Sequence, residues 1–209
     1  MPHDAQPHHS QIEIERKYDV DAEAQHPQLV GVGAVAVQGE PQRHELVATY
    51  FDTTDLALAR HHVAARVRRG GHDAGWHVKL PAEEGRTELH WELTDGDEPP
   101  AALREHLRDL IGDEPLVPIA RVTNQRDSVV LQDAAGFEMA ELTDDHVSSE
   151  NLRSGGTQQW REWEVELLGG APDSREGRTA LLDGIEERLL AAGARPSASS
   201  SKLQRALGL

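Results

Sequence analysis

Hydrophobic and polar residues alternate along much of the chain, which is the pattern of β-strands with one apolar face. The first such stretch is 11–18, where Glu13, Glu15 and Lys17 share one face and isoleucines occupy the other. Further alternating segments predict strands at 46–52, 64–69, 76–80, 86–93, 121–123, 128–132, 137–145 and 162–168. The segments 121–123 and 128–132 fit either two halves of a hairpin region or one bent strand.

Two segments show the three- and four-residue spacing of a helix with one apolar stripe. One is 100–111, with three leucines in register, and the other is 174–192. Ser174 can cap the second helix, and Gly193 follows it as a stop. Many strands with two intervening helices predict a mostly antiparallel sheet.

The polar faces of these strands carry charges of both signs. Arg66 shares a face with Arg68, and Lys79 shares one with His77, while the segment 162–168 aligns three glutamates. An open antiparallel sheet would expose such faces to water. If the sheet closes, the charged faces line the interior of a barrel, and helices cover part of the apolar outside.

Composition restricts the partners and the compartment. The 209 residues carry a formal net charge of −16, and such a surface repels phosphate backbones, so we expect no nucleic-acid surface. No stretch has the length and apolarity of a membrane span, and 1–10 lacks the apolar core of a secretion signal. The absence of cysteine excludes disulfides and thiolate metal sites. We expect a cytoplasmic protein with no membrane partner, a flexible leader at 1–10 and one domain at 11–209; its oligomeric state stays open.

A closed interior with both signs of charge suits a polyphosphate and a divalent cation. Arginine and lysine match phosphate oxygens, and carboxylates hold Mg²⁺ or Mn²⁺, hard ions that bridge protein and phosphate. Only three of the 21 basic residues are lysines: Lys17, Lys79 and Lys202. Each lysine is therefore a candidate for a position that needs a compact ammonium group.

In these residues the chain resembles the CYTH domain, also called the triphosphate tunnel metalloenzyme fold. The matching motifs, in family order, are Glu13, Glu15 and Lys17; Tyr50–Thr53; Arg66 and Arg68; Lys79, Arg86 and Glu88; Arg121; Asp144, Asp145 and Val147; Glu164, Glu166 and Leu167; and Ser201 with Lys202. Ala65 stands where the family motif has leucine. The resemblance extends from residue 12 to about 205, and all three lysines fall on its motifs.

The resemblance implies an α+β, β-dominated fold: an eight-stranded antiparallel β-barrel, or tunnel, with helices packed outside. It implies a metal-dependent triphosphatase that uses Mg²⁺ or Mn²⁺, with Lys79, Glu15 and Glu166 in catalytic roles. The basic residues implied to bind phosphate are Lys17, Arg66, Arg68, Lys79, Arg86, Arg121 and Lys202. The carboxylates implied to bind metal are Glu13, Glu15, Glu164, Glu166, Asp145 and Glu88. Fixing the glutamates is the alternative role for Lys17.

Several functions stay open at this point. The substrate is inorganic triphosphate or an organic triphosphate, whose terminal phosphoryl group would be hydrolysed. A second hypothesis is a non-catalytic module that binds polyphosphate and recruits a partner. A third is an adenylate cyclase, which would need room for ATP to fold back on itself. The chain also resembles the front half of proteins that continue into a helical, polyphosphate-associated CHAD domain.

Overall fold

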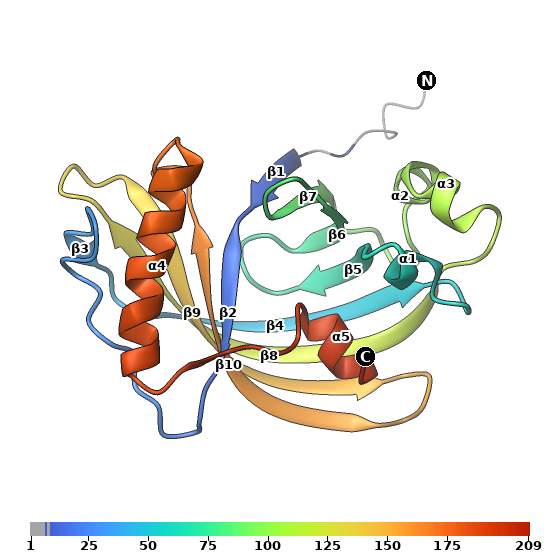
Figure 1. Ribbon diagram of the computed structural model, residues 1–209. Helices are drawn as coiled ribbons and strands as arrows, with labels where there is room; N and C mark the ends of the chain where they lie inside the picture. The colour runs from blue at the N-terminus through green and yellow to red at the C-terminus, as the bar shows by residue number, and fades with distance from the viewer. Residues whose placement is uncertain (1–6, 8) are drawn as a thin grey trace.

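The computed structural model describes residue 7 and residues 9–209, and in these residues the chain forms eleven strands and five helices (Figure 1). The strands are β1 (His9–Glu13), β2 (Glu15–Asp19), β3 (Val37–Gln38), β4 (Gln42–Asp52), β5 (Ala64–Arg69), β6 (Gly75–Pro81), β7 (Arg86–Trp91), β8 (Val117–Gln132), β9 (Glu138–Asn151), β10 (Thr157–Leu167) and β11 (Arg195–Pro196). The helices are α1 (Ala57–Arg60), α2 (Ala101–His106), α3 (Arg108–Ile111), α4 (Arg175–Ala191) and α5 (Lys202–Leu207).

All strands belong to one antiparallel sheet, in the order β1-β7-β6-β5-β4-β8-β9-β10-β2-β11, with β3 beside β8. Ile14 alone separates β1 from β2, yet β1 pairs with β7 at one end of this order and β2 pairs with β10 near the other. The stretch from His9 to Asp19 therefore closes the sheet on itself. The predicted antiparallel barrel is confirmed.

The strand count differs from the expected eight for an identifiable reason. Two of the eleven strands, β3 and β11, have only two residues each, and β1 and β2 are one strand broken at Ile14. When β3 and β11 are left out and β1 and β2 are counted as one strand, eight strands remain. The break occurs because Glu13 ends the pairing with β7, whereas Glu15 begins the pairing with β10.

Element boundaries follow the sequence patterns with some exceptions. The 64–69 segment coincides with β5, and the 121–123 and 128–132 segments are parts of one long strand, β8. The second predicted helix is α4, whose Ser174 Oγ accepts a hydrogen bond from Gly177 N–H at 3.1 Å. The first is interrupted at Leu107 into α2 and α3, and α1 and α5 were not predicted.

Helices cover separate parts of the barrel (Figure 1). Leucine and isoleucine side chains of α4 pack with Tyr18 and Trp163 on the outside of β2 and β10. Helices α1, α2 and α3 pack against β5, β6 and β7 around Trp76 and Trp91. Helix α5 differs, because its Leu203 packs against residues of β4 and β8 that face the barrel interior.

The N-terminal boundary differs from the expected leader at 1–10. Residues 1–6 and 8 lie outside the described residues, so the structure says nothing of them. His9 and Ser10 belong to β1 and pair with His90 and Leu89 of β7. Within the described residues, no helix combines the length and the apolar character needed to span a bilayer.

Candidate functional site

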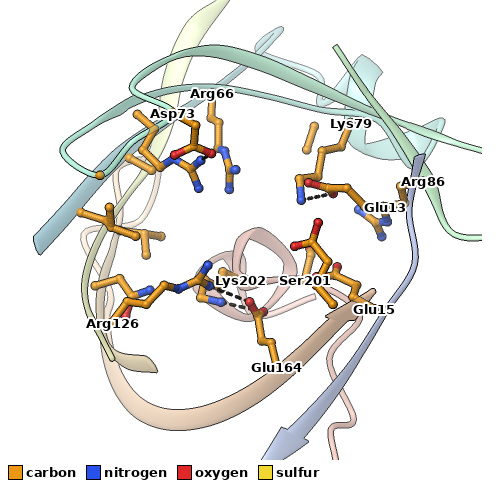
Figure 2. A pocket seen from close by; sticks show the side chains of 18 of the residues that line it. Glu13, Glu15, Arg66, Asp73, Lys79, Arg86, Arg126, Glu164, Ser201 and Lys202 are labelled. Atoms are coloured by element: carbon orange, nitrogen blue, oxygen red, sulfur yellow. Dashed lines mark hydrogen bonds and ion pairs between the residues drawn. The ribbon is translucent and has the colours of Figure 1, made fainter. Parts of the chain in front are cut away.

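The barrel encloses a cavity of about 310 Å³ whose lining is dominated by charged side chains (Figure 2). The acidic residues that line it are Glu13, Glu15, Asp73, Glu141, Glu164 and Glu166. The basic residues that line it are Lys17, Arg66, Arg68, Lys79, Arg86, Arg126 and Lys202. Alternation along the strands explains this convergence, because every second side chain of a barrel strand points inward. Both Glu-x-Glu pairs thus face the same interior.

One part of the cavity is neutralised by the protein's own cations. Lys202 Nζ lies 2.8 Å from Asp145 Oδ2, 2.6 Å from Glu162 Oε1 and 2.7 Å from Glu164 Oε1. Arg126 donates two hydrogen bonds to Asp145, at 2.7 and 2.6 Å, and one to Glu164 at 2.7 Å. Burial opposes ionisation of Asp145, yet Arg126 and Lys202 hold the pKa of this carboxyl below its usual value.

The same three carboxylates have the spacing of a metal site, because one oxygen from each lies within 4.8 Å of the others. The Lys202 ammonium, however, already contacts all three carboxylates. Replacing it with a divalent ion would require this buried ammonium to leave. We therefore do not assign the metal to this cluster.

A second acidic group, made of Glu13, Glu15 and Glu166, is less fully compensated. Within the described residues Glu166 makes no ion pair or hydrogen bond through its side chain. Burial, with the nearby charge of Glu13, raises the pKa of Glu166 to about 7. Burial also raises the pKa of Glu13 to about 7, although Lys79 contacts it and acts in the opposite direction.

Glu15 lies next to these two carboxylates and is held ionised. Its burial opposes the charge, but Lys17 Nζ at 3.0 Å lowers the pKa of Glu15 below the usual value. The protein's own cations are therefore too few to neutralise the three carboxylates of Glu13, Glu15 and Glu166. A fourth carboxylate, Glu141, also lines the cavity and lies opposite Glu166 in the strand register. Hard oxygen donors of this kind fit Mg²⁺ or Mn²⁺.

Glu88 lies behind the basic residues and does not line the cavity. Its Oε1 is 3.3 Å from Arg66 Nη2, 3.1 Å from His77 Nδ1 and 3.8 Å from Lys79 Nζ. Burial opposes its charge, but these neighbours hold the pKa of Glu88 well below its usual value. Burial lowers the pKa of His77 to about 3, so this imidazole is neutral near pH 7. Glu88 is thus placed to fix the basic side chains.

The other arginines expected from the sequence have different surroundings. Arg68 lines the cavity and pairs with Asp73 from the loop after β5. Burial, followed by the charge of Arg66, lowers the pKa of the Arg68 guanidinium to about 9. Arg86 also lines the cavity, and its side chain makes no ion pair with any described residue.

The structure does not bring Arg121 to the cavity. Its side chain is exposed on β8, and the alternate positions Val122, Asn124 and Arg126 face inward. Arg126 was missed because its segment between 123 and 128 showed no clear alternation. Counting every second residue of the strand from Val122 would have placed Arg126 on the inward face. Glu141 falls in the predicted strand 137–145, and no family motif named above includes it.

Comparisons with known proteins find relatives in sequence and in fold. Uncharacterised proteins of two Mycobacterium tuberculosis strains, CDC 1551 and H37Rv, are each 40% identical over 222 residues. The match takes in 100% of this chain but only 42% of each relative. The chain therefore spans less than half the length of these curated relatives.

Solved structures share the fold at low identity. A candidate adenylate cyclase of Bacillus halodurans is 24% identical with a TM-score of 0.64, covering 94% of this chain and 97% of that one. A Pyrococcus horikoshii protein is 19% identical with a TM-score of 0.56, covering 94% and 98%. A candidate adenylyl cyclase from Hippeastrum, described as revealing a dominant triphosphatase activity, is 18% identical with a TM-score of 0.50, covering 92% and 93%.

These likenesses to solved structures establish the fold alone. The family assignment comes from the sequence, because the model of the CYTH domain matches residues 11–188. This match takes in both Glu-x-Glu pairs and most of the chain. The protein belongs to the CYTH domain family.

Proposed function

We propose that this protein is a divalent-metal-dependent triphosphatase that hydrolyses the terminal phosphoryl group of inorganic triphosphate or of an organic triphosphate. The observation that carries the proposal is that a set of basic side chains and a set of glutamates line the same cavity. Basic side chains converge from several strands, and beside them Glu13, Glu15 and Glu166 lack enough cations to neutralise them. A bound triphosphate would pair with the basic side chains, and its metal would pair with the glutamates.

The basic residues would hold the phosphate oxygens. They are Lys17, Arg66, Arg68, Lys79, Arg86 and Arg126. Most of them already contact a carboxylate, so binding exchanges one anionic partner for another rather than ordering free side chains. Phosphoryl transfer needs little covalent chemistry from the protein, so positioning and charge stabilisation account for most of the rate.

Glu13, Glu15 and Glu166 would hold the metal. A bound Mg²⁺ or Mn²⁺ would neutralise charge on the terminal phosphoryl group. Lys79 Nζ contacts Glu13 of this group and would stabilise the oxygens of the reacting phosphate. In this proposal Glu88, Asp145 and Glu164 keep Arg66, Arg126, Lys79 and Lys202 in place instead of binding metal.

The family assignment supports this function. The description of the Hippeastrum protein as having a dominant triphosphatase activity is consistent with it. A polyphosphate-binding module without turnover is the second candidate. One observation favours it: Lys202 and Arg126 already pair with three buried carboxylates, so this part of the cavity is held together without any metal.

A phosphate-release panel tests the proposal. Triphosphate, ATP, thiamine triphosphate and long-chain polyphosphate are each incubated with Mg²⁺, with Mn²⁺ and with a chelator, and cyclic AMP is measured alongside. Orthophosphate release from a triphosphate that the chelator abolishes is the expected result. Tight polyphosphate binding with no release under either metal would favour the binding module, and cyclic AMP from ATP would favour the cyclase.

Metal binding should depend on pH. With pKa values of about 7, Glu13 and Glu166 are mostly protonated at about pH 6 and mostly ionised at about pH 8. A metal must displace these protons, and each one weakens its apparent affinity by roughly tenfold one unit below the pKa. Addition of Mg²⁺ should therefore raise the thermal midpoint more at about pH 8 than at about pH 6. Equal increments at both pH values would place the metal on other groups.

A further inference from the structure

The barrel wall has a second opening where the first strand is broken. A second hollow of about 310 Å³ adjoins the cavity and shares Glu13, Glu15, Lys17 and Arg86 with it. It lies at the Ile14 break, where β1 leaves the pairing with β7 and β2 joins β10. The bonding to β10 continues through Ile14, whose carbonyl accepts a hydrogen bond from Leu167 N–H at 2.9 Å. The pairing with β7 ends at Arg86, so the wall opens between the end of β7 and the segment after β11.

Chain segments on either side of the gap give the hollow a fixed rim. On one side, Gly85 has a φ of +70°, and a Cβ there would lie 1.9 Å from the Glu13 carbonyl oxygen, so only glycine allows this approach. On the other side, Ser197 N–H donates to the Lys17 carbonyl at 2.9 Å. Exposed residues on both sides, Gly85 and Ser200, show that the hollow opens to solvent.

The hollow has the donors of a small-anion site. Arg86 is half-buried and pairs with no carboxylate among the described residues, in contrast to the other cavity cations. Ser199 also lines the hollow, and its hydroxyl makes no hydrogen bond with a described residue. A guanidinium and hydroxyl groups together match the oxygens of a tetrahedral phosphate.

The main cavity alone would trap one product. At one end, α5 lies across the ring of strands and contributes Ser201, Lys202 and Leu203 to the lining (Figure 2). The cavity is also lined by the exposed residues His72 and Asp73 of the loop between β5 and β6, which mark a mouth open to solvent. A linear triphosphate that enters there places its terminal phosphate deepest. Hydrolysis replaces the bond to the bridging oxygen with a bond to a water oxygen, and the diphosphate then blocks the way back.

We propose that this hollow is an orthophosphate site and that the orthophosphate product leaves through it while diphosphate remains bound. The inference rests on the proposed triphosphatase function. It assigns Arg86 and Ser199 to product binding and gives the Ile14 break a role in turnover. The two products then leave by different openings, and orthophosphate does not have to wait for diphosphate.

Product inhibition tests this order of release. A product that leaves while the other stays bound inhibits noncompetitively against triphosphate, whereas the last product to leave competes with triphosphate for the free enzyme. We expect noncompetitive inhibition by inorganic phosphate in the natural protein. Competitive inhibition would overturn the proposal, since it means that orthophosphate binds the free enzyme and leaves last.

Filling the hollow separates this route from early release through the mouth. Ser199→Phe should lower kcat on the order of tenfold and leave a rapid burst of one orthophosphate per active site, because chemistry precedes a slowed release. Ala198→Phe is the matched control, since Ala198 is exposed and does not line the hollow. Native turnover in a folded Ser199→Phe protein would overturn the proposal.

A smaller substitution covers the case in which phenylalanine prevents folding. Arg86→Gln removes the unpaired cation, and the inhibition constant for inorganic phosphate should rise roughly tenfold, the scale of one charge-assisted contact. An unchanged constant would overturn the assignment of Arg86. If no triphosphate is hydrolysed at all, the proposed function fails first, and the absence of any orthophosphate release by the natural protein distinguishes that result.

Discussion

Glu166→Gln is expected to lower the rate of triphosphate hydrolysis by roughly 10²–10³-fold, the scale for loss of one preorganised charge-stabilising group. The substitution keeps the shape of the side chain and removes its charge. Glu166 faces the cavity and makes no ion pair with any described residue, so its charge serves no internal partner. Its raised pKa indicates that ionisation there is opposed by burial and by Glu13.

This absence of a partner separates activity from folding. The thermal midpoint of Glu166→Gln without metal should stay the same or rise, because a buried charge is removed and no hydrogen bond is lost. The increase in midpoint caused by Mg²⁺ should shrink. Glu138→Gln is the control, since Glu138 is exposed on β9 and does not line the cavity. A native rate in Glu166→Gln would move the metal site elsewhere.

Lys202→Met is expected to cause the largest loss of stability, about 3–5 kcal/mol, the cost of leaving buried charges without their partner. Methionine keeps the length of the side chain and removes the ammonium. Lys202 is only 10% exposed, and its three partners, Asp145, Glu162 and Glu164, are all buried. Arg126 remains, but it contacts only two of the three carboxylates.

The loss should depend on pH with a defined sign. Asp145 and Glu164 have pKa values below their usual 3.8 and 4.5 in the folded protein, so their pairing stabilises the fold above those values and is lost as the pH falls through the lowered ones. The difference between Lys202→Met and the natural protein should therefore be large near pH 7 and shrink in acid. Urea unfolding across this range measures it.

Two further variants define the origin of the effect. Arg205→Met removes a cation from the same helix, but its pair with Asp19 is partly exposed, so a loss of about 0–1 kcal/mol is expected. Adding Glu162→Gln to Lys202→Met should recover part of the stability, because one uncompensated carboxylate is removed. A Lys202→Met protein as stable as the Arg205→Met protein would mean that the carboxylates are solvated or protonated without Lys202.

Alternation along the chain predicted the strands and the residues that share a face, while the closed barrel was predicted from the resemblance to the CYTH domain. Glu164 and Glu166 could be placed from the alternation because β10 is regular over its whole length. The break at Ile14 could not be predicted, since the alternation of Glu13, Glu15 and Lys17 continues through it without a fault. The break arises because β1 pairs with β7 whereas β2 pairs with β10, and these pairings depend on where the other strands of the sheet lie.

Roles taken from family motifs were less secure than those taken from parity. Arg121 matched a motif but lies on the outer face of β8, and Arg126 occupies the inward position. Glu88 has inward parity, yet three basic side chains cover it. Lys202 was recognised as a motif residue, but the six residues of α5 have too short a pattern to predict a helix that closes the barrel.

The closure of the barrel by its first strand also sets an order for folding during synthesis. Lys17 and its partner Glu164 are 147 residues apart in sequence, so β2 cannot be paired until nearly all of the barrel has been made. Contacts of such long range slow folding, and unpaired strand edges promote aggregation. Chains that stop before β10 would expose two such edges, on β2 and on β9, and we expect them to aggregate where chains that extend past Leu167 do not.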